Sequence, residues 1–462
     1  MRHPDVIQII RQARIVTGAE LLARLQAARP TLSRATMMRM LKNLGDQIIS
    51  GGAARSSSYA VRRLIRGAFQ SYPLYQIDER GRGLLVGTLN PIYPNGCHFK
   101  PGPEFAWPIE PDWKGDWYAG LPYPLEDLRP QGFLGRLFAR NSSAVFQVSD
   151  DPSRWSEDDL LAVLSVVESD ASGNFILGEA AYRRFLKQMQ EGLKVIAEDR
   201  LDQIYADMAE QSMRQGVPGS SAGGEFPKFT ACRIKSGNPC HVIVKFSGSD
   251  QTPEVQRWKD LLVCEHLALE SISALLPCRA AQSIVVQGTQ RLFLEVQRFD
   301  RHGEFGRSPL CSWAAMASAL FGMSGVSWIV GANRLFQEKL ISESTRQHII
   351  ILWYFGKLIA NSDMHEGNLS FRPSAQTGLF ELAPAYDMLP MLYAPTRGVE
   401  LQKKIFAPDL PTPEEVPYWL IAAGAARQLW ECAAADPRIG ADFRAICAAN
   451  LDVLADAIKK ID

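Results

Sequence analysis

The polar loop around residue 363 carries side chains whose types and spacing could do chemistry. It reads Asn361-Ser-Asp-Met-His-Glu-Gly-Asn368 and follows an apolar segment, Ile349–Ala360. Asp363 and Asn368 are five residues apart, the interval between the Asp and Asn of a kinase catalytic loop. In that arrangement the Asp accepts the proton of a substrate hydroxyl and the Asn binds a metal ion. We therefore take Asp363 as the candidate base and Asn368 as a metal ligand, with His365 as a second candidate catalytic residue.

A second carboxylate, Asp387, lies in the segment Leu382-Ala-Pro-Ala-Tyr-Asp-Met388, after a strand-like stretch. A kinase has its principal Mg²⁺ ligand at this point of the chain. Mg²⁺ prefers oxygen ligands that are completed by phosphate oxygens, so Asn368 and Asp387 together predict a Mg²⁺ site. A lone Asp in a loop is usually a cap or turn residue, and the prediction therefore rests on the order of the whole series.

Lys245 interrupts a strand that otherwise looks buried, His241–Phe246. An unpaired buried charge is costly, so this lysine requires an anionic partner. The phosphates of ATP would serve, as they do for the strand lysine of kinases. Glu265, on a helix predicted over Trp258–Ala274, could also pair with it. The alternative is an edge-strand lysine that points to water.

The loop Val217–Glu225 consists mostly of small residues, whose backbone N–H groups can approach phosphates. It lacks the Gly-Lys-Ser/Thr ending of a P-loop. Gly219–Gly223 matches the nucleophile elbow of serine hydrolases, with Ser221 as nucleophile, but that motif requires a strand before it and a helix after it. Here a helical stretch precedes the loop and the strand-like Phe229–Ile234 follows. A flexible interdomain linker is the remaining alternative.

In this order the motifs resemble the HipA-type serine/threonine kinases of bacterial toxin–antitoxin systems, specifically the longer HipH-like (YjjJ-like) members. The resemblance covers roughly residues 70–460. It rests on Ser220-Ser-Ala-Gly-Gly, Val242-Ile-Val-Lys245, Glu295-Val-Gln-Arg-Phe-Asp-Arg301, Asn361-Ser-Asp-Met-His-Glu-Gly-Asn368 and Pro384-Ala-Tyr-Asp387. It implies an ATP-dependent enzyme that transfers the γ-phosphoryl group to Ser or Thr of a protein and inhibits growth.

The same resemblance implies a role for each motif. Lys245, paired with Glu265, would bind the ATP phosphates, while Gln297 and Phe299 would meet the adenine as a hinge. The phosphate-binding loop would be formed by Ser220, Ser221, Ala222, Gly223 and Gly224. The regulatory autophosphorylated serine of the family falls at Ser220. A phosphate there would add a charge of about −1.5 to −2 where the ATP phosphates should lie, so it would silence the enzyme.

The chain departs from the family after this loop. The family usually continues Gly-x-Gln-x-Lys, whereas this chain reads Gly223-Gly-Glu-Phe-Pro-Lys228. Pro227 also removes a backbone N–H donor. These differences predict weaker ATP binding and a different register of the loop.

The N-terminal region is strongly basic. Residues 1–70 hold 12 Arg or Lys and 3 Asp or Glu, a net charge of +9, whereas the remainder holds 38 and 47, a net of −9. Such a cluster attracts polyanions through counterion release.

Helical periods over Pro4–Arg14, Glu20–Gln26 and Arg34–Leu44 precede two β-prone segments, Gln47–Ser50 and Ser57–Val61. This order predicts a winged helix-turn-helix domain in residues 1–66. The DNA-contacting residues would be Arg34, Arg39 and Lys42 on the recognition helix and Arg55 on the wing. The alternative is a small basic domain that packs against the rest of the chain.

Composition and expected secondary structure divide the remaining chain into three parts. Residues 67–155, rich in Pro, Gly and aromatic residues, predict a β-rich module with strands near Gly83–Leu89 and Ala144–Val148. Residues 156–310 predict a kinase N-lobe with the Gly-rich loop, and residues 311–462 a helical C-lobe with the catalytic loop. The expected fold class is α+β, a bilobal protein-kinase-like fold with an N-terminal winged helix-turn-helix domain.

Composition also indicates the cellular location of the protein and the state of its cysteines. No apolar stretch reaches the ~20 residues that span a bilayer, and the N-terminus lacks the plan of a signal peptide. A cytoplasmic protein without membrane contact is therefore expected, associated with the nucleoid where it binds DNA. Eight scattered cysteines without a CxxC pair predict buried free thiols. Expected partners are ATP, Mg²⁺, a protein substrate and DNA, and by resemblance a helix-turn-helix antitoxin.

Two other functions stay open. One is a DNA-binding regulator or DNA-acting toxin whose kinase fold is weak or inactive, which the basic N-terminus and the altered Gly-rich loop favour. The other, ranked well below it, is a serine hydrolase that acts through Ser221.

Overall fold

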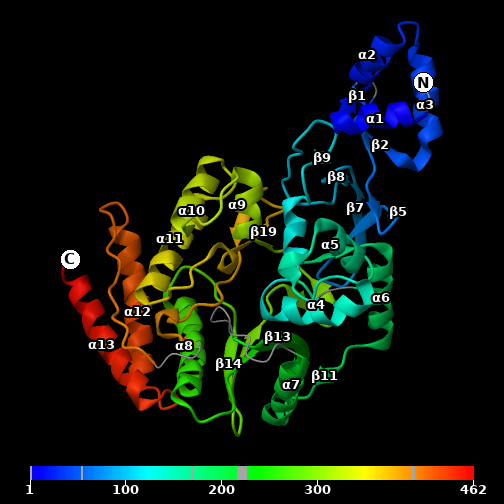
Figure 1. Ribbon diagram of the computed structural model, residues 1–462. Helices are drawn as coiled ribbons and strands as arrows, with labels where there is room; N and C mark the ends of the chain where they lie inside the picture. The colour runs from blue at the N-terminus through cyan, green and yellow to red at the C-terminus, as the bar shows by residue number, and fades with distance from the viewer. Residues whose placement is uncertain (1–2, 54–55, 168–169, 216–225, 397–400, 462) are drawn as a thin grey trace. The chain divides into compact units, whose positions relative to one another are not determined.

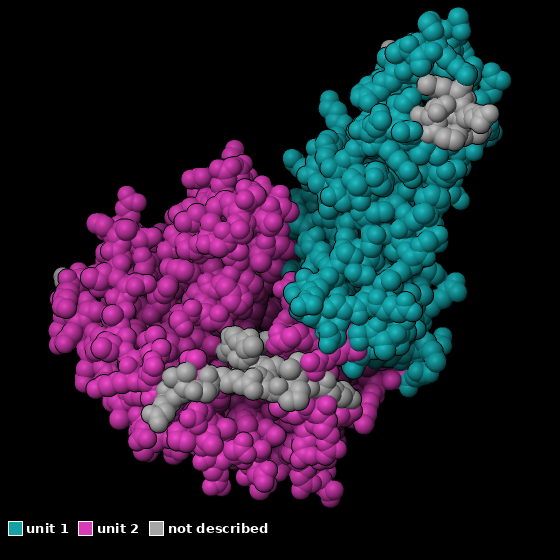
Figure 2. Space-filling model, in the orientation of Figure 1, with its two compact units in different colours: residues 1–78, 82–129, 141–191 teal, residues 79–81, 130–140, 192–462 magenta. Residues whose placement is uncertain are grey.

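The chain forms two compact units that each combine helices and strands (Figure 1). The computed structural model describes residues 3–53, 56–167, 170–215, 226–396 and 401–461. Unit 1 comprises residues 1–78, 82–129 and 141–191, and unit 2 comprises residues 79–81, 130–140 and 192–462, coloured teal and magenta in Figure 2. Among the described residues, no helix has the length and apolar character needed to cross a membrane.

Unit 1 begins with three helices and a small antiparallel sheet. The helices are α1 (His3–Ala13), α2 (Gly18–Ala28) and α3 (Arg34–Leu44). The strands are β1 (Ile15–Thr17), β2 (Ile48–Gly51) and β3 (Ser58–Val61), in the order β1-β3-β2. The predicted helices and the two predicted strands are present. Strand β1 was not predicted, because three residues are too few to show a period.

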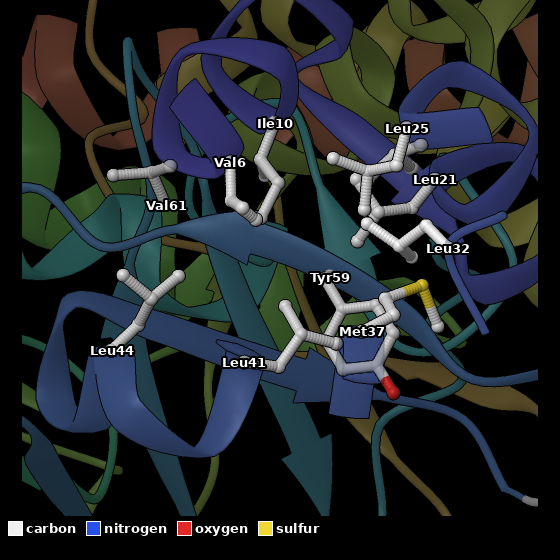
Figure 3. Packing of buried hydrophobic residues seen from close by; sticks show 11 residues of the cluster. Val6, Ile10, Leu21, Leu25, Leu32, Met37, Leu41, Leu44, Tyr59 and Val61 are labelled. Atoms are coloured by element: carbon white, nitrogen blue, oxygen red, sulfur yellow. The ribbon is translucent and has the colours of Figure 1, made fainter. Parts of the chain in front are cut away.

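Local sequence explains where these helices begin. The hydroxyl of Thr17 accepts a hydrogen bond from the backbone N–H of Glu20, and that of Ser33 accepts one from Thr36, so both residues are N-caps. Apolar side chains then face inward at helical spacing and pack against the sheet (Figure 3). The buried cluster consists of Val6, Ile10, Val16, Leu21, Leu25, Leu32, Met37, Leu41, Leu44, Tyr59 and Val61.

The second part of unit 1 is built on a five-stranded antiparallel sheet of order β10-β6-β7-β8-β9. Its strands are β6 (Tyr72–Ile77), β7 (Gly83–Pro91), β8 (Cys97–Pro101), β9 (Trp117–Tyr118) and β10 (Phe175–Leu177). A short hairpin, β4 (Leu64–Ile65) and β5 (Ala68–Phe69), precedes it, and α5 (Glu157–Leu164) and α6 (Glu179–Glu191) come later in the chain. Because β10 pairs with β6, residues after 155 complete the sheet that earlier residues begin.

The predicted strand at Ala144–Val148 is wrong. Residues 144–146 form the end of helix α4 (Gly132–Phe146). A short apolar run cannot be distinguished from the last turn of a helix by its period alone. Val145 is 76% exposed, so its side chain packs against little.

The two parts of unit 1 share a close seam. The indole Nε1 of Trp117 donates to the hydroxyl of Ser58 at 2.7 Å, and both side chains are buried. A Cβ atom at Gly51 would lie 2.3 Å from the carbonyl oxygen of Gly115, so β2 can approach this closely only because residue 51 is glycine. The seam therefore depends on residues from both sides.

Unit 2 begins with a five-stranded sheet of order β11-β12-β13-β15-β14. The strands are β11 (Val195–Ile196), β12 (Lys228–Lys235), β13 (Asn238–Phe246), β14 (Ser283–Gln287) and β15 (Leu292–Gln297). Helices α7 (Leu201–Gln215) and α8 (Pro253–Leu275) pack against it, and Figure 1 shows them on either side of β13 and β14. The predicted strands Phe229–Ile234 and His241–Phe246 are present as β12 and β13, and the predicted helix Trp258–Ala274 is present as α8, which begins five residues earlier.

Side-chain alternation assigns the two faces of this sheet. Phe229, Val242 and Val244 point to the face that buries Tyr205 and Ala209 of α7. Neighbouring residues on a strand point to opposite faces, so Lys245 faces the other way, toward α8. The outer face, toward α7, thus buries these apolar side chains, and the inner face, toward α8, carries Lys245.

The rest of unit 2 is mainly helical. Its helices are α9 (Trp313–Phe321), α10 (Trp328–Gln337), α11 (Glu343–Leu358), α12 (Val416–Ala435) and α13 (Ala441–Ile458). Its strands are β16 (Arg301–His302), β17 (Gly306–Arg307), β18 (Cys311–Ser312), β19 (Ser370–Pro373) and β20 (Phe380–Leu382). All eight cysteines are free, and seven are buried as predicted, whereas Cys432 is exposed.

Candidate active site

Lys245 and Glu265 form a buried ion pair on the inner face of the sheet. Lys245 lies in the middle strand β13, and Glu265 in the second half of α8. The ammonium Nζ donates to both carboxylate oxygens of Glu265 at 2.7 Å, and the two side chains are only 7% and 1% exposed. The pair that the sequence suggested is therefore present, and Lys245 does not point to water.

Asp387 completes this cluster from a loop of the helical region. Its Oδ1 contacts Nζ of Lys245, and its backbone is in the left-handed region at φ 56°, which Asp tolerates better than most residues. The loop is held just upstream, because Ala385 exchanges backbone hydrogen bonds with Arg279 and Ala281 at 2.8 and 2.9 Å. One cation and two carboxylates from three distant segments thus meet at one place.

Burial and charge act on the pKa values of this cluster in different ways. Burial lowers the pKa of Lys245, but the charges of Asp387 and Glu265 outweigh it and leave that pKa raised. Burial acts to raise the pKa of Asp387, but Lys245 outweighs it and lowers the value to about 2. At Glu265 burial exceeds the effect of Lys245, so the pKa is raised. Asp387 therefore stays ionised, and Glu265 is the carboxylate that takes up a proton more readily.

The polar loop after α11 is tied together by its own amides. Asn361, which is buried, accepts a hydrogen bond from the backbone N–H of Asp363 at 2.9 Å and donates to the carbonyl oxygen of Asp387 at 3.4 Å. The amide Nδ2 of Asn368 donates to the carbonyl oxygen of Asp363 at 3.0 Å. Asp363 and Asn368 are thus held in one loop, and Asn361 connects that loop to Asp387.

His365 and Asp363 leave their side chains accessible at the surface of this loop. Nδ1 of His365 accepts a hydrogen bond from the N–H of Gly367 at 3.0 Å, which leaves the proton of a neutral ring on Nε2. Nε2 lies 4.0 Å from Oδ1 of Asp363, and the two side chains are 58% and 52% exposed. The carboxylate of Asp363 is therefore free to meet a substrate.

The donor set suits Mg²⁺. Asn368 uses its Nδ2 within the loop, so its Oδ1 is the atom left for a metal ion. Asp387 brings an ionised carboxylate whose pKa Lys245 keeps low against the effect of burial. Oxygen ligands of this kind, completed by phosphate oxygens and water, are what Mg²⁺ prefers.

The two hinge candidates lie at the end of β15 and just beyond it. The N–H of Gln297 donates to the carbonyl oxygen of Gln282 at 2.8 Å. The carbonyl oxygen of Phe299 accepts from Nη2 of Arg372 at 2.5 Å. In the part of the chain that the structure describes, the N–H of Phe299 has no acceptor, so it is available to a ligand.

Several predicted residues lie elsewhere. Arg34, Arg39 and Lys42 are exposed on α3 and form no ion pair with a residue within the described ranges. Outside the described residues lie Arg55 of the predicted wing and Ser220, Ser221, Ala222, Gly223 and Gly224 of the Gly-rich loop.

Two residues of the site belong to the sequence motifs, but the sequence assigned no role to them. Asn361 orders the candidate catalytic loop, and an Asn side chain that accepts from the backbone N–H two residues on is a known local turn. Tyr386 donates to the carbonyl oxygen of Gly367 at 2.8 Å and lies 2.7 Å from Oγ of Ser370, so it braces the loop from the other side. Its position directly before Asp387 is the only sequence signal for this role.

Comparison with known proteins identifies the class of this site. A family model described as a HipA-like C-terminal domain matches residues 220–435, which contain all the site residues of unit 2. A second, described as the middle domain of YjjJ-like toxins, matches residues 68–186. Toxin YjjJ of Escherichia coli (strain K12) is 36% identical over 424 residues, which cover 90% of this chain and 91% of that protein. The chain belongs to the YjjJ-like toxin family, and its residues 220–435 match a HipA-like C-terminal domain.

Two solved structures of low sequence identity are also similar to this chain. One is the Shewanella oneidensis MR-1 toxin–antitoxin complex of HipA, HipB and operator DNA, with 14% identity, a TM-score of 0.48, and coverage of 84% of this chain and 97% of that one. The other is the Helicobacter pylori proinflammatory kinase CtkA, with 14% identity, a TM-score of 0.38, and coverage of 53% and 93%.

Proposed function

We propose that this chain is a toxin that acts as an ATP-dependent serine/threonine protein kinase. The observation that carries the proposal is the buried contact of Lys245 with both Glu265 and Asp387. Through Asn361, Asp387 is connected to the loop of Asp363. In a bilobal kinase-like fold the sheet of β12–β15 would be the N-lobe, and the helices from α9 onward the C-lobe.

Each residue has a role that its surroundings support. Lys245 would bind the ATP phosphates, and Gln297 and Phe299 would bind the adenine through their backbone. Asn368 and Asp387 would hold Mg²⁺, which neutralises charge on the phosphates. MgATP supplies the phosphoryl group that is transferred.

The exposed carboxylate of Asp363 would accept the proton of a Ser or Thr hydroxyl as the protein substrate approaches. His365 would donate a hydrogen bond from Nε2 toward that carboxylate. We further propose that the chain phosphorylates its own Ser220, because the resemblance to HipA-type kinases assigns the regulatory serine to this position of the sequence. The added charge would then oppose ATP binding.

The test is phosphate transfer by the purified full chain. Incubation with Mg²⁺ and labelled ATP, followed by mass spectrometry of the peptide Gly219–Lys228, should reveal phosphate on Ser220. Asp363→Asn should abolish the label and the growth inhibition. Asp456→Asn, on the exposed end of α13, is the matched control and should change neither. Retention of label and toxicity in Asp363→Asn would contradict the proposal.

We also propose that residues 1–66 form a winged helix-turn-helix that binds DNA. Three cations of α3, Arg34, Arg39 and Lys42, are exposed and unpaired within the described part of the domain. Removing cations that touch DNA phosphates should weaken binding to duplex DNA and reduce its salt dependence by about one counterion for each cation removed. The double variant Arg39→Ala/Lys42→Ala should show this in fluorescence anisotropy, whereas Lys187→Ala on α6 should not.

The same variants decide between this function and a protein that acts through DNA alone. If toxicity survived Asp363→Asn but was lost in Arg39→Ala/Lys42→Ala, the kinase proposal would give way to a DNA-acting toxin. A helix-turn-helix antitoxin in trans stays a prediction, to be tested by co-expression with neighbouring reading frames.

A further inference from the structure

Arg372 connects the strand that leaves the catalytic loop to the predicted hinge. It lies in β19, four residues after Asn368. Its Nη2 donates to the carbonyl oxygen of Phe299 at 2.5 Å, and its guanidinium carbon lies 5.2 Å from the centre of the Phe299 ring. One side chain therefore holds both the backbone and the ring of the same hinge residue, by a charge-assisted hydrogen bond and a cation–π contact.

Phe299 has a second contact with the catalytic side of the site. Its ring lies 5.9 Å from that of Tyr386 at an interplanar angle of 38°. Tyr386 precedes the metal-ligand candidate Asp387, and its hydroxyl is hydrogen bonded to Gly367 and Ser370, which flank Asn368 and Leu369. The hinge residue thus contacts the segments that carry both metal-ligand candidates.

Partial burial of the Arg372 side chain costs free energy, because it removes the guanidinium group from water. The side chain is half-buried, and its Nε finds no hydrogen-bond partner among the residues that the structure describes. Burial also lowers the pKa of this guanidinium, although the charges of Asp300, Glu79 and Glu381 oppose that effect. An arginine that only covered the surface could extend its charged end into water at a smaller cost, so the contact with Phe299 is the main interaction that keeps it here.

We propose that Arg372 is a positioning residue for phosphoryl transfer, which keeps the hinge in register with the Mg²⁺ ligands. The inference rests on the proposed kinase function. An adenine bound at Phe299 sets where the phosphates of the same nucleotide lie. If Arg372 releases Phe299, the adenine end shifts relative to Asn368 and Asp387. A misplacement of about 1 Å at reacting groups is enough to reduce a rate by about 10²-fold.

Arg372→Met tests this role, because it keeps the length of the side chain but removes the donor and the charge. We expect the KM for ATP to rise and the kcat of Ser220 phosphorylation to fall, each about tenfold. The dissociation constant of a fluorescent ADP analogue should rise by a similar factor, a readout that does not depend on turnover. Arg372→Lys retains a donor and a cation and should recover part of both losses.

The matched control is Arg346→Met. Arg346, on α11, also lies over a phenylalanine ring, 5.6 Å from the centre of Phe336 on α10. Within the described part of the chain, it pairs with Glu343 and contacts neither the hinge nor the polar loop residues named above. The substitution Arg346→Met should leave the KM for ATP, the kcat and the affinity for the ADP analogue unchanged. If Arg372→Met yields too little folded protein, Arg372→Lys and Phe299→Ala together decide. A partial loss in Arg372→Lys and a larger loss in Phe299→Ala would support the role, and wild-type values in both would overturn it.

The outcomes separate this inference from the function beneath it. Wild-type KM, kcat and ADP affinity in Arg372→Met, with an active wild type, would overturn the role of Arg372 and leave the kinase proposal intact. A wild-type protein that neither bound the ADP analogue nor transferred phosphate would overturn the kinase proposal and this inference with it.

Discussion

The sheet of unit 2 carries one buried charged cluster on each face, and the two differ in where their members come from. On the outer face, Glu295 of β15 accepts from the Tyr205 hydroxyl at 2.7 Å and from Nε and Nη2 of Arg233 at 2.6 and 2.7 Å. The side chains of Arg233 and Glu295 are 6% and 3% exposed. On the inner face, Lys245 and Glu265 are as well buried, but Asp387 reaches them from a loop and is 31% exposed.

We interpret the outer cluster as structural and, under the proposed kinase function, the inner cluster as functional. Every partner of Glu295 lies on a helix or strand that packs in the core around α7, and its carboxylate accepts hydrogen bonds from three donors. The inner cluster depends on a loop carboxylate, and its cation has a second possible anion in a nucleotide phosphate. Changes to the outer cluster should therefore affect folding, and changes to the inner cluster should affect phosphoryl transfer.

The largest expected effect is on stability at the outer face. Arg233→Met leaves Glu295 buried without its cation, so the free energy of unfolding should fall by about 3–5 kcal/mol. Urea titration measures this loss. Arg214→Met is the control, because Arg214 forms an exposed pair with Glu210 on the same α7 helix, worth at most about 1 kcal/mol. Equal losses in the two variants would contradict the assignment of the outer cluster as structural.

The next effect is on activity at the inner face. Lys245→Met should reduce phosphoryl transfer by about 10²-fold or more, since a fixed donor to the phosphates is lost. It should also abolish the rise in melting temperature that we expect MgATP to produce in the wild type. The loss of stability should be smaller than in Arg233→Met, because burial already raises the pKa of Glu265, which can take up a proton. If Lys245→Met kept its activity and lost more stability than Arg233→Met, the inner cluster would be the structural one and the comparison would be reversed.

The smallest effect is on pH dependence, and it also belongs to the inner face. Lys245 lowers the pKa of Asp387 from 3.8 to about 2, so the stabilisation is present above the unfolded value and lost as the pH falls toward 2. Between pH 5 and pH 3 it should decrease by about 1 kcal/mol. The difference in unfolding free energy between the wild type and Asp387→Asn should shrink by this amount. A difference that stayed constant would show that Asp387 is not ion-paired in solution.

Much of this site could be predicted from the sequence, because its strongest signals are local. Lys245 in an apolar strand required an anion, and Glu265 lay on the next helix. The interval between Asp363 and Asn368 placed both in one loop. These inferences depend on short stretches whose types and spacing restrict the chemistry.

The rest required three-dimensional pairing. Arg233, Glu295 and Tyr205 are separated by 62 and 90 residues in the chain, and nothing near any of them shows that they meet. Arg372 gave no signal, because an arginine on a short strand usually points to solvent. Residues 156–191 were assigned to the next domain by their helical periods, but β10 is a three-residue strand whose place is set only by pairing with β6.

The seam inside unit 1 bears on how this chain could change over evolutionary time. Trp117, Ile92 and Ala60 form one buried cluster, and Arg63 pairs with Glu157 at 2.7 Å, so the first 66 residues share a core with the second part of unit 1. Recombination that exchanged only those residues would place foreign side chains against Trp117 and a Cβ atom at position 51 against Gly115 unless glycine came with them. The two parts are therefore expected to be inherited as one block, and under the proposed DNA binding a new specificity would arise by substitution on the exposed face of α3.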